Sequence, residues 1–281
     1  MSYIQADNLI KEYGSGETSF TAVKGMSFEI QQGEFAAIMG ESGSGKSTLL
    51  TMMGALNSPS SGTYSVDDIE VYSLGQDQRA EFRREFLGFI FQSFYLIPYL
   101  TALENVMLPL VTARMTSSEK RSMAEKALEQ VRLDGKSHRL PGEISGGEQE
   151  RLAIARAIVN EPTILLADEP TGNLDSNNSH AIMNLFQTLN DSGMTVVMVT
   201  HSQDCAQYAK RILRVSDGLL MDEEDTIQKS NTLAEEGMWQ QAGKMKEGLE
   251  YEEYENGFVQ QVCDIRRNGF SGCRRGRGVR V

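Results

Sequence analysis

The segment at residues 40–48 has the residue types and spacing of a phosphate-binding loop. It reads GESGSGKST and matches the pattern G-x-x-x-x-G-K-[S/T] in full. In such a loop, successive backbone N–H groups converge on phosphate oxygens, and glycine allows the dihedral angles that this requires. We expect Lys46 to reach the β- and γ-phosphates of a nucleotide and the Ser47 hydroxyl to ligate Mg²⁺. The predicted phosphate-binding residues are Gly40, Ser42, Gly43, Ser44, Gly45, Lys46, Ser47 and Thr48.

Two acidic residues end an apolar segment further along the chain. Residues 164–169 read ILLADE, so Asp168 and Glu169 follow a predicted buried strand. We expect Asp168 to hold Mg²⁺ and Glu169 to orient and polarise an attacking water. Acidic residues at a strand end can also be merely solvated. The phosphate loop upstream, at the spacing of a parallel sheet, favours the catalytic interpretation.

A second anion-binding feature lies in the segment ISGGEQERLAIARA, at Ser145, Gly146 and Gly147. A serine followed by two glycines at a helix start directs backbone N–H groups and partial positive charge toward an anion. Helix capping accounts for part of the role of Ser145. One nucleotide does not need two phosphate sites in one domain. We therefore expect this feature to complete the pocket of another copy.

Strands and helices alternate along the part of the chain that must position these residues. Apolar segments predict strands at Phe35–Met39, 87–91, 163–167 and Thr195–Thr200. Helical patterns occupy about 46–56, 117–131 and 177–190, and a loop is expected at 59–62. Residues 3–13 and 22–30 predict an opening antiparallel layer. The predicted fold class is α/β, a phosphate-loop NTPase core with a mostly parallel sheet, an N-terminal antiparallel β layer and an inserted helical subdomain at about 93–160.

Composition and charge limit the partners of the chain. Its 281 residues carry a formal net charge of −12, so we expect no nucleic-acid partner. The chain has an odd, sparse set of three cysteines, Cys205, Cys263 and Cys273, which fits a reducing compartment better than a disulfide framework. No stretch approaches eighteen consecutive apolar residues, and no signal peptide is evident. We therefore expect a soluble protein whose membrane partner, if any, is another chain.

The last part of the chain has a different composition. Residues 222–225 and 250–255 are acidic clusters, and residues 274–281 are rich in arginine and glycine. Few apolar residues recur at a fixed period there. We expect the folded domain to occupy residues 1–221 and residues 222–281 to form a poorly ordered extension.

These motifs together resemble the nucleotide-binding subunits of ABC transporters over about residues 1–220. The segment SGGEQER is similar to that family's signature motif. The resemblance implies ATP and Mg²⁺ as ligands and an ABC ATPase domain at 1–221. It assigns catalytic roles to Glu169, His201, Gln92 and Lys46, and metal binding to Ser47, Gln92 and Asp168. It also implies that two copies close head to tail around two ATP molecules.

Four positions take their particular roles from the resemblance. Tyr13, in KEYG, matches an aromatic residue that stacks on adenine, and Asp175, in GNLDS, matches a loop that crosses the dimer interface. Gln92, in FIFQ, matches a glutamine that senses Mg²⁺ and the γ-phosphate and faces the membrane partner. His201, in VTHS, matches a histidine that contacts the γ-phosphate. An aromatic residue near a strand is more often part of a core, and a lone histidine is more often structural.

The signature departs from the family's most frequent sequence at two positions. Ile144 and Glu148 stand where leucine and glutamine are most frequent. The change at Ile144 is conservative. Glu148 adds negative charge near a phosphate-binding turn, which could slow turnover or weaken dimer closure. Because Ser145 and backbone N–H groups make the main contacts, we expect function to survive.

The function implied is that of an ATP-binding and ATP-hydrolysing subunit that powers a separate membrane permease. Segments such as VNEPTILLADEPTGNLDS look most like the macrolide-export and lipoprotein-release branch. The expected location is the cytoplasmic face of the inner or plasma membrane, through the permease. One alternative is an ABC ATPase without a transporter. Another is an ATP-binding regulatory subunit with little hydrolysis, which only Glu148 favours.

Overall fold

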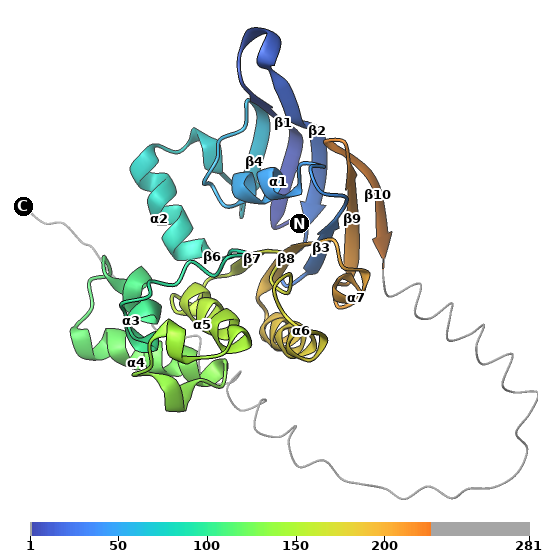
Figure 1. The fold of residues 1–281 in the computed structure, drawn as a ribbon. Coiled ribbons are helices and arrows are strands. Elements are labelled where there is room, and N and C mark those ends of the chain that lie inside the picture. The colour runs from blue at the N-terminus through green and yellow to red at the C-terminus, as the bar shows by residue number, and fades with distance from the viewer. Residues whose placement is uncertain (1, 226–281) are drawn as a thin grey trace, which may run out of the picture. The chain divides into compact units, whose positions relative to one another are not determined.

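The computed structural model describes residues 2–225, which form two β-sheets with helices packed on them (Figure 1). The larger sheet has six strands in the order β10-β9-β3-β8-β7-β6. Its strands are β3 (Phe35–Met39), β6 (Leu87–Ile90), β7 (Ile164–Asp168), β8 (Thr195–Thr200), β9 (Arg211–Ser216) and β10 (Leu219–Asp225). All pairs in this sheet are parallel except β9 with β10. The predicted mostly parallel sheet is confirmed.

The smaller sheet is antiparallel and has the order β2-β1-β4-β5. It contains β1 (Ile4–Tyr13), β2 (Phe20–Ile30), β4 (Ser61–Val66) and β5 (Ile69–Glu70). The first two strands confirm the predicted antiparallel layer. The loop predicted at 59–62 was wrong in part, because Ser61 and Gly62 belong to β4. That strand forms because its buried Tyr64 and Val66 join the core beneath β1.

Side chains of the central strands alternate between two cores. In β3, Ala36 and Ile38 face one core, and Phe35, Ala37 and Met39 face the other. This burial on both faces explains why β3 is wholly apolar. The first core lies between the two sheets and includes residues of α1 (Lys46–Met53) and two phenylalanines of α2 (Gln76–Phe86).

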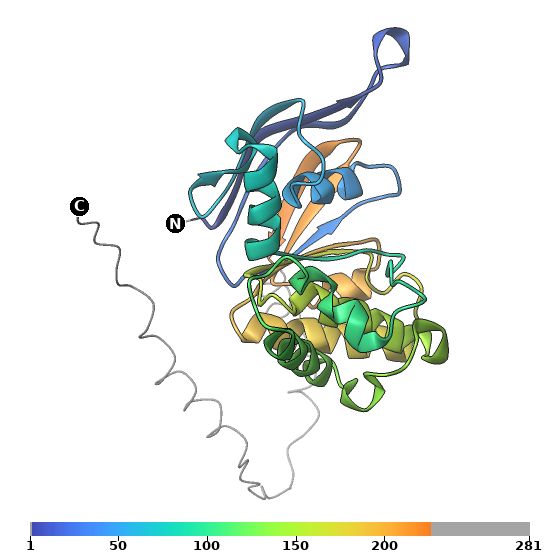
Figure 2. The ribbon, with the colours of Figure 1, turned by 90° about the vertical axis from the view of Figure 1, so that its left-hand side faces the viewer.

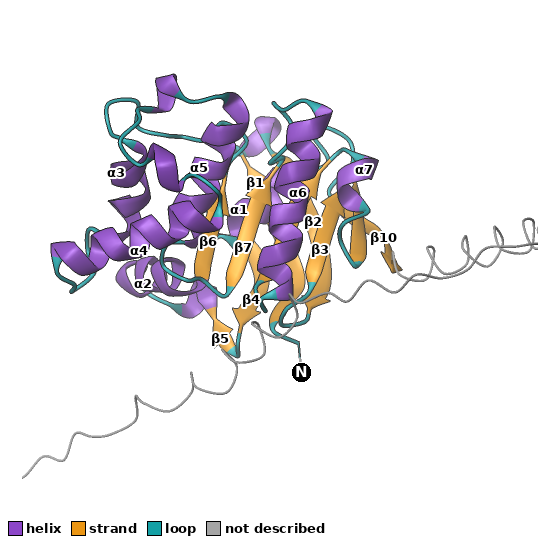
Figure 3. Ribbon diagram, turned by 90° about the horizontal axis from the view of Figure 1, so that it is seen from below, coloured by secondary structure: helices purple, strands orange, loops and turns teal. Residues whose placement is uncertain are grey.

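The second core lies beneath the remaining helices. These are α3 (Ala102–Met107), α4 (Ser117–Gln130), α5 (Gly146–Ile158), α6 (Ser176–Asp191) and α7 (Gln203–Ala206). Figure 2 shows α3, α4 and α5 grouped away from the antiparallel sheet, as the predicted helical subdomain requires. Figure 3 shows α6 lying along the strands of the parallel sheet. The loops that leave the carboxyl ends of β3, β7 and β8 therefore meet at one edge.

Strand β10 extends beyond the domain boundary predicted at residue 221. It pairs with β9 as far as Asp225, opposite Arg211. The acidic composition of 222–225 does not prevent this pairing, because a sheet edge is held by backbone hydrogen bonds. Residues 226–281, with Cys263 and Cys273, lie outside the described residues. Within residues 2–225, no helix combines the length and apolar character that crossing a bilayer requires.

Candidate nucleotide site

The phosphate loop runs from the end of β3 to the start of α1, and neighbouring strands pass directly against it. Gly45 has a φ of +99°. A Cβ atom on Gly45 would lie 2.3 Å from the carbonyl oxygen of Ala22 in β2. A Cβ atom on Gly40 would lie 2.0 Å from the carbonyl oxygen of Val215 in β9. Both positions therefore require glycine, because no side chain fits between the loop and these backbones.

The turn between β9 and β10 also holds the loop. The Gly218 N–H donates to the carbonyl oxygen of Ser44 at 3.0 Å, and the Gly218 carbonyl accepts from the Lys24 N–H at 2.7 Å. The turn thus ties the loop to β2. No local sequence pattern connects Gly218 with the phosphate loop.

Two polar side chains of the loop, those of Ser44 and Lys46, are buried. Lys46 is 5% exposed, and its Nζ donates to the carbonyl oxygen of Glu41 at 2.6 Å. The Ser44 hydroxyl oxygen is buried and has no hydrogen-bond partner among residues 2–225. A buried hydroxyl without a partner is costly, and a phosphate oxygen would satisfy it. The ammonium group and the helix N-terminus favour the same anionic ligand.

Ser47 and Asp168 connect the phosphate loop with the end of β7. The Ser47 hydroxyl donates to Asp168 Oδ1 at 3.1 Å. Burial raises the pKa of Asp168, and the negative charge of Glu169 acts in the same direction, whereas Ser47 and Lys46 oppose the shift. A hydroxyl and a carboxylate beside a phosphate site are oxygen ligands of the kind that Mg²⁺ takes. The residues present therefore fit this ion.

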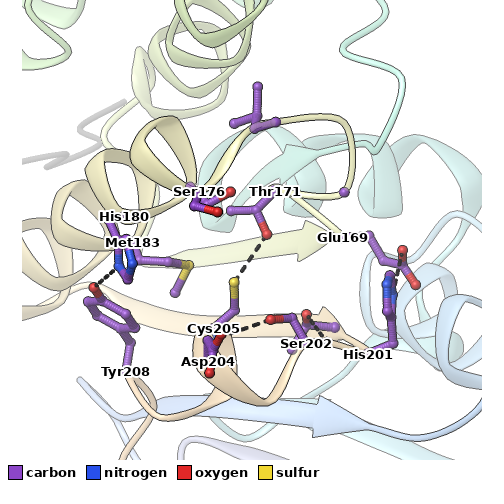
Figure 4. A pocket seen from close by; sticks show the side chains of 14 residues that line it. Glu169, Thr171, Ser176, His180, Met183, His201, Ser202, Asp204, Cys205 and Tyr208 are labelled. Carbon is purple, nitrogen blue, oxygen red and sulfur yellow. Dashed lines mark hydrogen bonds and ion pairs between the residues drawn. The ribbon is translucent and has the colours of Figure 1, made fainter.

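Glu169 and His201 form a pair at the same edge of the sheet. Glu169 follows β7 and His201 follows β8, which are parallel neighbours. His201 Nδ1 lies 3.0 Å from Glu169 Oε2, and the two side chains point toward each other (Figure 4). Glu169 has a φ of +47°, and its N–H donates to the Val199 carbonyl oxygen at 2.9 Å. This geometry turns the chain sharply after Asp168.

Gln92 lies beside this pair. A Cβ atom on Gly172 would lie 3.3 Å from Gln92 Nε2 and 3.5 Å from Glu169 Oε2, so the amide and the carboxylate converge on one glycine. Asn173 Nδ2 donates to the Gln92 carbonyl oxygen at 3.0 Å. No sequence motif marks Asn173, although it stands two residues before Asp175 in GNLDS.

Tyr13 presents a half-buried aromatic ring at the end of β1. Its ring stacks on the exposed ring of Phe20, with 5.5 Å between centroids and an interplanar angle of 25°. Its hydroxyl accepts a hydrogen bond from Asn57 Nδ2 at 2.6 Å. Lys11 Nζ lies 5.2 Å from the ring centroid, a cation–π distance. Phe20 was not predicted, because it faces Tyr13 only through the pairing of β1 with β2.

Ser145 does not lie with Lys46. Helix α5 packs in the core on one face of the parallel sheet, and α1 packs on the other. The Ser145 hydroxyl caps α5 in a reciprocal arrangement with Glu148, whose carboxylate accepts from the Ser145 N–H at 2.8 Å. The phosphate loop and the signature of one chain are therefore separate sites.

Asp175 lies close to the signature through Asn178. Asp175 caps α6, and its carboxylate accepts from the Asn178 N–H at 2.9 Å and from Asn178 Nδ2 at 2.7 Å. A Cβ atom on Gly147 would lie 2.6 Å from Asn178 Oδ1. Two predicted interface segments thus form one surface.

The charge of Glu148 is paired within the chain. The Lys136 ammonium donates to the Glu148 carboxylate, and this contact, with the hydrogen bond from Ser145, holds the pKa of Glu148 at about 2. The additional negative charge that the sequence placed beside the signature is therefore offset by a neighbouring cation. Lys136 lies nine residues before Ser145, and no motif singled it out.

A pocket of about 240 Å³ adjoins Glu169 and His201 (Figure 4). On its far side, Thr171 Oγ1 lies 3.2 Å from Cys205 Sγ. His180 Nδ1 lies 2.9 Å from the Tyr208 hydroxyl. The first contact joins the turn after β7 to α7, and the second joins α6 to the segment after α7. Packed elements therefore support the Glu169–His201 pair.

Comparisons with known proteins agree with this geometry. The ABC transporter family matches residues 23–172. An uncharacterized ABC transporter ATP-binding protein of Methanocaldococcus jannaschii is 45% identical over 219 residues, which cover 78% of this chain and 98% of that protein. The macrolide export ATP-binding/permease protein MacB of Bdellovibrio bacteriovorus is 40% identical over 270 residues, covering 95% of this chain. The chain spans only 41% of the length of that second relative.

Solved structures show the same fold. The dimeric structure of a bacterial ABC transporter cassette has a TM-score of 0.74 and 43% identity, covering 79% of this chain and 98% of that chain. A dimeric post-hydrolysis state of that cassette, bound to ADP and Pi, has a TM-score of 0.74 and 42% identity, with the same coverage.

Proposed function

The chain belongs to the ABC transporter family, and from that premise we propose that its Glu169–His201 pair hydrolyses ATP to drive a membrane permease. ATP binding and an ATPase activity follow from the family and from the related cassette bound to ADP and Pi. The observation that carries the proposal is that five side chains converge at the carboxyl edge of the parallel sheet. They are Lys46, Ser47, Asp168, Glu169 and Gln92.

Binding begins at the phosphate loop. The buried Lys46 ammonium and the Ser44 hydroxyl face the phosphates, and the first turn of α1 presents its N–H groups to them. Tyr13, with Phe20 and Asn57 around it, provides the surface on which adenine stacks. ATP is thereby held both at its phosphates and at its adenine ring.

The Mg²⁺ ion that accompanies ATP would be held by Ser47, Asp168 and Gln92. When bound, the ion would offset the negative charge of the phosphates during transfer. The hydrogen bond of Ser47 with Asp168 keeps their oxygens close together before any ligand is present.

Hydrolysis takes place at Glu169. Its carboxylate accepts a hydrogen bond from the attacking water and orients the water oxygen toward the γ-phosphorus. A new oxygen–phosphorus bond forms, the bond to the β-phosphate oxygen breaks, and the proton of the water passes to phosphate or to Glu169. With His201 Nδ1 facing Glu169, the ring would donate to the γ-phosphate from Nε2 as an imidazolium that carries both N–H groups.

Two copies must cooperate in this cycle. Ser145 and Lys46 of one chain lie on opposite faces of the sheet, so Ser145 serves the ATP of a second copy. The related cassette was solved as a dimer. In the closed state each ATP lies between Lys46 of one copy and Ser145 of the other, and loss of the γ-phosphate releases the dimer.

The permease docks beside Gln92. The segment that follows Gln92 exposes three apolar side chains, with Tyr95 64%, Ile97 39% and Tyr99 87% exposed. Exposed aromatic residues on one short segment are typical of an interaction surface. A relative covered over 98% of its length is itself named an ATP-binding protein, which supports a permease on a separate chain. Docking places the protein at the cytoplasmic face of the membrane.

Substitution Glu169→Gln tests this assignment. The variant should bind ATP with unchanged affinity, hydrolyse it at least about 100-fold more slowly and accumulate as a dimer in ATP. Steady-state ATPase assays and light scattering measure these properties. Glu125→Gln, on the exposed face of α4, is the matched control and should behave as the wild type. Normal turnover by Glu169→Gln would show that another residue activates the water.

A further inference from the structure

The segment that follows Gln92 has an unusual backbone. Phe94 and Tyr95 are consecutive residues with φ of +54° and +46°, and neither is glycine. Side chains with a Cβ atom rarely adopt this region, so other contacts must hold it. The Phe94 N–H donates to the Phe91 carbonyl at 3.1 Å, and the Phe91 and Tyr95 rings meet edge to face at 5.2 Å. Gln92 thus lies inside a tight turn.

Arg156 of α5 holds this turn from outside. Its guanidinium donates one hydrogen bond to the Phe94 carbonyl oxygen and another to the Tyr95 carbonyl oxygen. The Arg156 side chain is half-buried, and this burial lowers the pKa of its guanidinium. The planar guanidinium presents its donors in a fixed fork, so it determines the relative orientation of the two carbonyl groups.

The contacts of Arg156 connect two parts of the nucleotide site. Its helix, α5, starts at the signature, where Ser145 is the N-cap residue. The turn that it holds contains Gln92, whose own carbonyl is held by Asn173 from the segment after Glu169. Gln92 is therefore fixed on one side by the catalytic segment and on the other by the signature helix.

We propose that Arg156 is a positioning residue that acts through Gln92: it holds the left-handed Phe94–Tyr95 turn against the signature helix and so places the Gln92 amide beside Glu169. This inference rests on the proposed ATPase function. It implies that a movement of the exposed Tyr95 side chain, where the permease is proposed to dock, shifts Gln92 and α5 together.

Four variants test the inference on the full-length protein. These are Arg156→Ala, Arg156→Lys, Gln92→Ala and the double variant Gln92→Ala/Arg156→Ala. Arg121→Ala is the matched control, because Arg121 pairs with Glu125 on the surface of α4. Steady-state kinetics give kcat and KM for ATP, calorimetry gives the Kd for ADP, and hydrogen exchange reports on the backbone at residues 91–96.

We expect Arg156→Ala to lower kcat about tenfold while the Kd for ADP changes less than about twofold. Arg156→Lys should lose less activity than Arg156→Ala, because its ammonium can still donate to one carbonyl group. It should remain below the wild type, because one ammonium cannot hold both carbonyl groups in a fixed orientation. Exchange at residues 91–96 should accelerate in both. Because Arg156 acts through Gln92, the double variant should turn over as Gln92→Ala does. Arg121→Ala should match the wild type.

Three results would overturn the inference: wild-type kcat in both Arg156 variants, wild-type kcat in Gln92→Ala, or losses that multiply in the double variant. If Arg156→Ala does not fold, Arg156→Lys takes its place in the double-mutant cycle. These failures are distinct from a failure of the proposed function, which would appear as absent ATPase activity in the wild type or as normal turnover by Glu169→Gln.

Discussion

At the scale of the residue, the signature segment SGGEQER contains two carboxyl groups in opposite environments. Glu148 is paired with Lys136 and Ser145, and its pKa lies at about 2. Glu150, two residues later, is 1% exposed, and its Oε1 atom has no hydrogen-bond partner among residues 2–225. Burial alone raises the pKa of Glu150 to about 8. The positions of the two residues on α5 explain this difference in pKa. Glu148 lies in the first turn of the helix, and Glu150 faces the interior of the protein.

Glu150 should make the protein less stable as the pH rises. The unfolded chain ionises Glu150 near pH 4.5 and the folded chain near pH 8, so folding free energy is lost progressively between these values. Glu150→Gln removes the ionisation and should be more stable than the wild type at pH 8, by on the order of a few kcal/mol. Urea unfolding from pH 5 to pH 8 measures this difference.

The matched control for Glu150→Gln is Glu81→Gln, since Glu81 is an exposed glutamate on α2. It should keep the wild-type dependence on pH. Parallel stability curves for the wild type and Glu150→Gln over this range would show that Glu150 is not held in its neutral form.

At the scale of the element, the phosphate loop owes its shape to strands that are distant in sequence. Backbone atoms of β2 and β9 lie where side chains at Gly45 and Gly40 would have to fit, and Gly218 donates to Ser44. The loop is therefore preorganised before ATP arrives, which lowers the entropy lost on binding.

Gly45→Ala should disrupt the loop. The added Cβ meets the Ala22 carbonyl oxygen at 2.3 Å in addition to the left-handed dihedral, so we expect a loss of roughly 2–4 kcal/mol in unfolding free energy and weak ATP binding. Gly43→Ala is the matched comparison, because Gly43 shares the left-handed region but has no atom within 4 Å of the added Cβ. Equal losses in the two variants, measured by urea unfolding, would contradict the steric explanation.

At the scale of the whole molecule, the parallel sheet separates the two halves of the predicted ATP site. The phosphate loop opens α1 on one face, and Ser145 opens α5 on the other. Gly147 and Asp175 share Asn178 as a neighbour, so the signature and the Asp175 segment form one surface, which we propose faces the second copy. The proposed ATP site is therefore complete only with two copies.

Mixing two inactive variants should restore activity. Lys46→Ala removes the phosphate contact, and Ser145→Arg blocks the signature, so each homodimer has two defective sites. A mixed dimer carries both defects in one site and has the other site intact. The ATPase rate of an equimolar mixture should therefore exceed the mean of the two separate rates. A mixture that only averages the separate rates would show that Lys46 and Ser145 serve the same chain.

The sequence by itself determined the parts that depend on neighbouring residues. The phosphate loop, the Asp168–Glu169 pair and the strands Phe35–Met39 and Thr195–Thr200 are visible because loop geometry and burial on both faces of a sheet constrain consecutive residues. The family resemblance extended this to Gln92 and His201. The structure places both beside Glu169.

Only the tertiary structure decided which distant residues hold those parts in place. Arg156 meets Phe94, Lys136 meets Glu148 and Gly218 meets Ser44 across elements whose approach depends on packing. The strand β4 and the end of β10 likewise form because β1 and β9 offer them backbone partners. Such contacts leave no periodic pattern in the sequence, because each is made by single residues far apart along the chain.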